Sequence, residues 1–135
     1  MRIQRGLLAL FAVALLTIAA CSSTPAGVSS GSVKTAIEGA AKITLVDQTA
    51  SVGAGAPSGT TILTNIPTAT TDLQVVAVFV ADTAANAKVA SDAMTASLSG
   101  LGAGKVYSNK NVVVYYAALG GTDNSAAVEA AVKGL

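Results

Sequence analysis

The sequence contains no histidine, no tryptophan and a single cysteine, Cys21. Without histidine it lacks the usual general base, the commonest ligand for soft metals and the side chain that titrates near neutral pH. One cysteine forms neither an intramolecular disulfide nor a cysteine-based zinc site. We therefore predict a noncatalytic protein that holds no metal and no other cofactor and is stabilised by packing alone.

Charge is also scarce, because only 11% of the residues are charged. Both arginines, Arg2 and Arg5, lie at the N-terminus, and beyond residue 20 six lysines accompany seven acidic residues. Charges so balanced and scattered offer no surface for a phosphate backbone, so we expect no binding to nucleic acid. With 135 residues, 52% of them hydrophobic, the chain has the size of one domain and is too apolar to be disordered overall.

The first 20 residues contain the three parts of an export signal. The two arginines form a positive start, Gly6–Leu16 is an apolar stretch, and the small residues Ala19 and Ala20 precede Cys21. The run from Gly6 to Ala20 has 15 residues, fewer than the ~20 that a helix needs to cross the hydrocarbon core. This pattern predicts a signal peptide over residues 1–20 rather than a permanent transmembrane helix.

The four residues Ile18-Ala19-Ala20-Cys21 resemble the lipobox of bacterial lipoproteins. The resemblance implies cleavage between Ala20 and Cys21, a diacylglyceryl group on the Cys21 sulfur, and a further acyl chain such as palmitate on the new amino terminus. Two acyl chains hold a protein stably on a bilayer. The resemblance thus implies a lipid-anchored protein on the extracytoplasmic face of a cell membrane, inner or outer according to the organism.

There are two alternatives to lipid attachment at Cys21: a buried residue of a signal-anchor helix and a reactive thiol. The second is disfavoured because the chain has no histidine to activate the thiol. The bias of the remaining chain toward Ala, Gly, Thr and Val looks like that of small, uncharacterised lipoproteins of high-GC Gram-positive bacteria.

Ser22–Ser32 consists of small and polar residues with one proline, a composition typical of a flexible tether. Ten such residues have a root-mean-square span of roughly 17 Å. We therefore expect the lipidated cysteine and its tether over residues 21–32 and a folded domain over residues 33–135.

The first part of that domain has weak local signals. Apolar residues at helical spacing, β-branched runs and turn-forming residues indicate its elements. We expect a helix from a Ser32 cap to Lys42, a strand at Ile43–Val46, a glycine-rich loop at Ser51–Gly59, a strand over 60–67 ended by Pro67, and a turn over 68–72.

The second part has clearer patterns. A continuous apolar run predicts a buried strand at Leu73–Ala81, and Asp82 or Thr83 then provides a cap for a helix. That helix is expected over Ala84–Ser99, with an apolar stripe of Ala90, Met94, Leu98 and Leu101, and an end at Gly100 and Gly102. Two strands, Lys105–Tyr107 and Asn111–Ala118, follow around a turn with a left-handed Asn109, and then a helix over Ser125–Gly134 with Val128, Ala131, Val132 and Leu135 inside.

These elements predict one α+β domain. It has a mainly antiparallel sheet of about four or five strands with two or three helices packed on it, and the C-terminal order β-α-β-β-α. Both faces of the strands at Val75–Val80 and Val112–Val114 are apolar, and the rings of Tyr115 and Tyr116 must point to opposite faces. Either helices cover both faces, or one face is an exposed apolar surface for a partner or ligand.

Three glycine-containing stretches resemble known motifs only superficially. Gly27–Gly31 matches G-x-S-x-G, but no strand precedes it and no histidine exists to activate the serine. Gly100–Lys105 departs from the P-loop, because Ser99 replaces the first glycine and Val106 follows the lysine. Gly53–Gly59 is expected to be a surface loop, with a role in contacts or as a lid as the alternative. The acidic residues occur singly, which leaves paired carboxylates as an open alternative.

Two functions follow from these observations. The first is a noncatalytic envelope protein-interaction module, anchored to the membrane through lipid on Cys21 and in contact with an envelope protein. The second is a carrier or sensor of a small apolar ligand bound between sheet and helices. A flat apolar patch favours the first, and an enclosed pocket of a few hundred cubic ångströms favours the second.

Overall fold

The computed structural model describes residues 27–52, 54–65, 73–99 and 104–135. These residues form α2 (Ser30–Ala41), β1 (Leu45–Asp47), α3 (Thr49–Val52), β2 (Thr61–Asn65), β3 (Leu73–Val80), α4 (Ala84–Leu98), β4 (Lys105–Asn109), β5 (Val112–Gly120) and α5 (Ser125–Lys133). All five strands join one antiparallel sheet in the order β1-β2-β3-β5-β4. The predicted α+β class and the C-terminal order β-α-β-β-α are confirmed.

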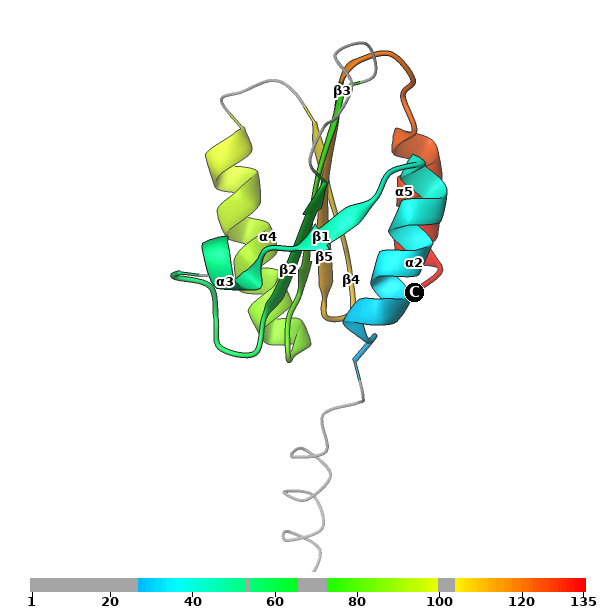
Figure 1. The fold of residues 1–135 in the computed structure, drawn as a ribbon. Coiled ribbons are helices and arrows are strands. Elements are labelled where there is room, and N and C mark those ends of the chain that lie inside the picture. Colours follow the sequence, from blue (N-terminus) through cyan, green and yellow to red (C-terminus); the bar gives the residue numbers. More distant parts are fainter. Residues whose placement is uncertain (1–26, 53, 66–72, 100–103) are drawn as a thin grey trace, which may run out of the picture.

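Helices cover both faces of this sheet (Figure 1). Helices α2 and α5 lie side by side on one face, and α3 and α4 lie on the other. Residues of β3 alternate between buried and partly buried side chains, as expected for a strand with a larger core on one side. The apolar residues on both faces of β3 and β5 are therefore explained by two helical layers.

The larger core lies under α2 and α5. Val33 and Ile37 of α2, and Val128 and Val132 of α5, are each four residues apart and fully or almost fully buried. They pack on the inner residues of the sheet: Leu45, Leu63, Val76, Val78, Val80, Val112, Val114 and Tyr116. Burial of one such aliphatic side chain stabilises a fold by about 1.5–3 kcal/mol, so this cluster dominates the stability of the domain.

The layer under α4 is thinner. Thr83 caps the helix, since its Oγ1 accepts a hydrogen bond from the Asn86 N–H at 3.1 Å. The buried part of this cluster consists of Ala81, Ala87 and Val113, with partly buried residues around them that include the predicted Ala90 and Met94. Because most inward residues of α4 are alanines, the helix covers the sheet over a narrow strip.

The folded region begins earlier than predicted. Ser29 is the N-cap of α2, its Oγ accepts from the Ser32 N–H at 3.2 Å, and Val28 packs against the larger core. The part of the expected tether from residue 27 to 32 therefore belongs to the domain. Small polar residues are typical of linkers and also of helix caps, and in this segment Ser29 is the cap of α2. At the other end α2 stops at Ala41, and Lys42 adopts a left-handed conformation with φ of 59°.

Three local predictions differ from the structure. The strand predicted at Ile43–Val46 lies at Leu45–Asp47, and α3 was not predicted. The left-handed residue of the last hairpin is Lys110, with φ of 50°, because Asn109 pairs with Val112 in the ladder. The predictions for the signal peptide, Cys21, Pro67, the turn over 68–72, Gly100, Leu101 and Gly102 lie outside the described residues.

Candidate binding groove

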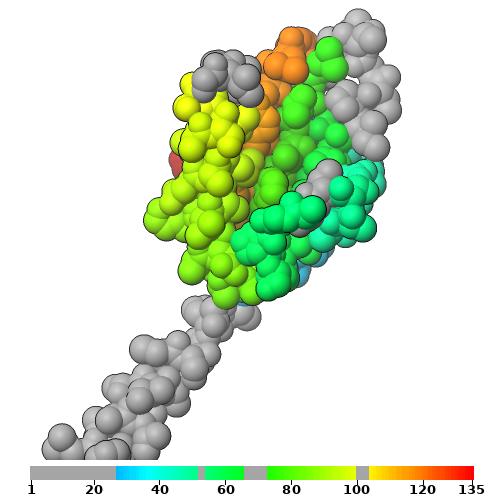
Figure 2. Space-filling view, turned by 90° about the vertical axis from the view of Figure 1, so that its left-hand side faces the viewer, coloured from blue at the N-terminus to red at the C-terminus, as the bar shows by residue number. Residues whose placement is uncertain are grey.

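A groove of about 270 Å³ lies between α4 and the loop of residues 54–57. We call it the α4 groove. Figure 2 looks onto this side, where the helix (yellow-green) and the segment before β2 (green to teal) flank a hollow above the sheet. Its floor consists of Ile62 and Phe79, which are cross-strand partners on β2 and β3. The walls contain Val89, Ala90, Ala93 and Met94 on one side and Ala54, Gly55, Ala56 and Pro57 on the other.

The helical wall of the α4 groove is apolar and partly unpacked. Val89 and Ala93 are four residues apart, so they lie on the same side of α4. Val89 is 60% exposed, the largest fraction among the exposed large hydrophobic side chains of the described residues. Two of the other wall residues of the helix, Ala90 and Ala93, are small, which keeps the hollow open beside an exposed valine.

The loop wall depends on two glycines with positive φ. Gly55 and Gly59 have φ values of 92° and 78°, a region that side chains rarely adopt. A Cβ on Gly59 would lie 3.0 Å from the Asp82 Cβ, so glycine allows the loop to pass close to the start of α4. The Thr60 N–H donates to the Pro57 carbonyl at 3.3 Å and closes the loop before β2.

Helix α3 connects this loop to the floor of the groove. The Thr49 Oγ1 accepts a hydrogen bond from the Ile62 N–H at 2.9 Å and donates to the Asp47 Oδ1 at 2.6 Å. The Thr49 N–H donates to the same carboxylate at 2.9 Å, and these bonds lower the pKa of Asp47. The sequence "DQT" contains this motif, an Asp two residues before a Thr, and is the signal by which α3 was predictable.

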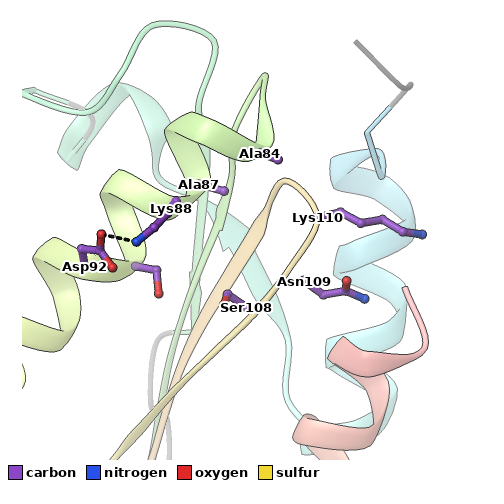
Figure 3. A pocket seen from close by; sticks show the side chains of 8 residues that line it. Ala84, Ala87, Lys88, Asp92, Ser108, Asn109 and Lys110 are labelled. Carbon is purple, nitrogen blue, oxygen red and sulfur yellow. Dashed lines mark hydrogen bonds and ion pairs between the residues drawn. The ribbon is translucent and has the colours of Figure 1, made fainter.

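A second and larger hollow, of about 470 Å³, lies between the start of α4 and the β4–β5 turn (Figure 3). Its charged residues already have partners: the Lys88 Nζ donates to the Asp92 Oδ2 at 2.7 Å. The Asn109 and Lys110 side chains point away from α4, where they bond to carbonyls of Val132 and Leu135. Since these side chains do not converge on the hollow, we take the α4 groove as the candidate site.

The glycine motifs singled out in the sequence have structural roles where the structure describes them. Ser29 of Gly27–Gly31 has its side chain occupied as the cap of α2. Lys105 of Gly100–Lys105 is the first residue of β4, and residues 100–103 lie outside the described part. Residues 54–57 of the Gly53–Gly59 loop form a wall of the groove, which sequence reasoning did not locate because it depends on how the loop packs against α4.

The described carboxylates are engaged individually. Asp123 accepts from the Ser125 N–H at 2.8 Å, and Glu129 pairs with Lys133 at 2.6 Å. These bonds lower the pKa of both carboxyl groups, and hydrogen bonds from Lys34 and Leu45 lower that of Glu38. A carboxylic acid that donates a proton at neutral pH needs the opposite shift.

Among the described residues no cluster of three or more acidic or cysteine side chains has the arrangement of a metal site. No helix in the described ranges is both long and apolar enough to span a bilayer. Comparisons of the chain with protein-family models, curated proteins and solved structures found no match.

Proposed function

We propose that the protein is a noncatalytic, lipid-anchored module of the bacterial cell envelope that binds an apolar segment of a neighbouring envelope protein in the α4 groove. The observation that carries the proposal is an open apolar groove with an exposed valine, Val89, on its rim. The proposed membrane anchor is the lipid on Cys21 of the lipobox-like Ile18–Cys21, which directs the domain to the extracytoplasmic face of a membrane.

The lining of the groove favours an uncharged apolar occupant. It contains no charged residue, and the neighbouring Lys88 and Asp92 neutralise one another. Such a surface excludes charged ligands, because burial of an unpaired charge is costly. Apolar side chains of a partner satisfy this condition without a requirement for polar contacts.

The size of the groove favours a side chain presented by a protein over a free small molecule. Pockets for small molecules have volumes of about 300–1,000 Å³ and bury most of the ligand. The α4 groove, at about 270 Å³, is smaller and open along the surface. A carrier or sensor of a small apolar ligand is therefore the second candidate, supported by the apolar lining alone.

Site-specific photocrosslinking in the native envelope tests the partner. A photoreactive amino acid at Val89 is expected to give one defined protein adduct, whereas the same group at Leu119, which is 57% exposed and outside the groove, is not. Val89→Glu should reduce the co-purification of that partner at least tenfold, and Leu119→Glu should leave it unchanged. The same adduct from both positions contradicts the proposal, and a small apolar mass on the intact monomer supports the carrier instead.

Fatty-acid labelling tests the anchor separately. Cys21→Ser is expected to abolish incorporation of the label and to leave the uncleaved precursor in the membrane. Ser22→Ala, beside the modified residue, provides the control and should be labelled normally. Unchanged labelling of Cys21→Ser contradicts the lipid anchor.

A further inference from the structure

The start of the domain is bound to the β4–β5 turn by one side chain. Asn111 is buried, and its Oδ1 accepts from the Val28 N–H at 2.7 Å. Its Nδ2 donates to the Val28 carbonyl at 3.1 Å and to the Ala81 carbonyl at 2.9 Å. A Cβ on Gly27 would lie 2.5 Å from the Asn111 amide, so the chain approaches this side chain too closely for any residue but glycine. Asn111 thus fixes where the N-terminal segment leaves the domain.

The N-terminal segment joins the domain at one end of the sheet. We call this the entry end and define it by Val28, Ala81–Thr83, Lys110, Asn111 and Leu135. The Ala81 N–H donates to the Asn111 carbonyl at 2.8 Å, and the Lys110 ammonium bonds to the Leu135 carbonyl. In Figure 1 the entry end is the lower end of the domain, where α2 begins. The far end contains Leu73 and Gly120, which pair at the other end of β3 and β5.

The chain between the proposed anchor and this exit is short. Seven Cα–Cα steps separate Cys21 from Val28, and a fully extended chain of this length reaches at most about 25 Å. Strand β3 has eight residues and is therefore about 26 Å long. If the far end faced the bilayer, the connecting chain would have to run the whole length of the sheet at full extension.

We propose that the domain stands on the bilayer with its entry end against the lipid headgroups and with the α4 groove opening sideways. This orientation rests on the proposed lipid anchor at Cys21. Phe79 of the groove floor is two residues before Ala81 of the entry end, so the floor of the groove lies near the membrane-proximal end of β3. A partner reaches it along the membrane surface, as a neighbouring membrane-bound protein does.

Charge contributes little to this orientation. The entry end contains one cationic side chain, Lys110, and one anionic side chain, Asp82, so these two charges balance. Lys34, Lys88 and Lys133 pair with Glu38, Asp92 and Glu129. An electrostatically held surface releases from the bilayer as salt rises, whereas a covalently set orientation does not. We therefore expect the orientation to be the same in 0.05 M and 0.5 M salt and on neutral and anionic lipids.

Energy transfer to labelled lipid headgroups tests the orientation. Lys110→Cys and Gly120→Cys each introduce one thiol into the mature lipoprotein, and a fluorophore on that thiol reports its height above phosphatidylcholine vesicles whose headgroups carry the acceptor. We expect at least twofold stronger transfer from Lys110→Cys than from Gly120→Cys. Ser108→Cys and Leu119→Cys provide a second probe of each end if either first variant folds poorly. Equal or reversed transfer overturns the orientation.

The number of reactive thiols separates this inference from its premise. A lipidated Cys21 leaves one free thiol per variant chain, so two reactive thiols and no flotation with vesicles would overturn the anchor and this orientation with it. Insertion of ten Gly and Ser residues between Pro25 and Ala26 then isolates the effect of chain length. The difference between the two ends should shrink by at least half, and an unchanged difference would overturn the role of the short connection.

Discussion

Tyr116 and Gln74 form a hydrogen bond inside the larger core, with 2.9 Å between the tyrosine Oη and the amide Oε1, although the residues are only 1% and 3% exposed. The same hydroxyl accepts from the Asn124 N–H at 2.8 Å. The Asn124 Nδ2 donates to the Gln74 Oε1 at 3.2 Å and to the Ala41 carbonyl at 3.0 Å. These bonds connect the end of α2, strands β3 and β5 and the start of α5.

Tyr116→Phe is expected to destabilise the domain by about 1–3 kcal/mol. The variant leaves the Asn124 N–H without its acceptor and the Gln74 oxygen with one donor fewer, and such buried unsatisfied groups cost energy of this size. Urea unfolding followed by circular dichroism measures the change in the free energy of unfolding.

Tyr107→Phe is the matched control for this prediction. The buried Tyr107 hydroxyl makes no hydrogen bond of normal geometry to any described residue. Its removal should leave stability unchanged or raise it by up to about 1 kcal/mol. An equal loss in both variants would show that the tyrosine hydroxyls contribute only through shape.

Two glycines should respond oppositely to the same substitution. Gly39 lies inside α2 with open space around its Cβ position, so Gly39→Ala is expected to stabilise the domain by about 0.5–1 kcal/mol. Gly104 has φ of 88°, and a Cβ there would lie 2.5 Å from the Tyr115 ring, so Gly104→Ala should destabilise it by about 1–3 kcal/mol. Thermal unfolding of the two variants under identical conditions tests whether the unfolding temperature rises for Gly39→Ala and falls for Gly104→Ala. A change in the same direction for both variants would contradict the prediction for one of the two glycines.

Stability should be constant from about pH 5 to about pH 9.5, since no histidine titrates in between. In the folded state, hydrogen bonds lower the carboxyl pKa values of Glu38, Asp47, Asp123 and Glu129. The unfolded chain therefore binds protons first on acidification, and stability is lost as pH falls through the folded pKa values.

At alkaline pH, stability changes with pH in the opposite direction. Burial raises the pKa of Tyr107, and the hydrogen bond to Glu129 raises that of Lys133. The unfolded chain then loses protons first, so stability is lost as pH rises above about 10. Urea midpoints measured from pH 3 to pH 11 test both limits, and Asp47→Asn should weaken the acid dependence alone. A fall in the midpoint between pH 6 and pH 8 would contradict the prediction.

The elements with strong local patterns were predictable from the sequence. The apolar run of β3, the cap and helix of α4 and the apolar spacing of α5 each contain enough residues to define their structure locally. The start of α2 was not, because its cap Ser29 lies in a segment that otherwise resembles a linker. Helix α3 had only the short Asp47–Thr49 motif as a local signal, and Ile62, which donates to the Thr49 hydroxyl, lies 13 residues further along the chain.

The candidate groove was not predictable in the same way. Its residues come from a loop, two strands and a helix, and the close approach of Gly59 to Asp82 places the end of the loop near the start of α4. The contact of Asn111 with Val28 was not predictable either, since the two residues lie 83 positions apart along the chain. The sequence indicates that Asn111 lies near a turn and contains no local signal for this contact.

The pairing of α2 with α5 sets the order in which the domain can be completed. The first helix of the described chain packs beside the last, and both cover the same face of the sheet. Until Ser125–Lys133 has emerged, Val33 and Ile37 lack the neighbour that closes the larger core. Contacts between distant segments form late and slow folding. A chain that emerges from its N-terminus therefore stays incompletely folded for nearly its whole length, which is the state that the proposed export through a narrow membrane channel requires.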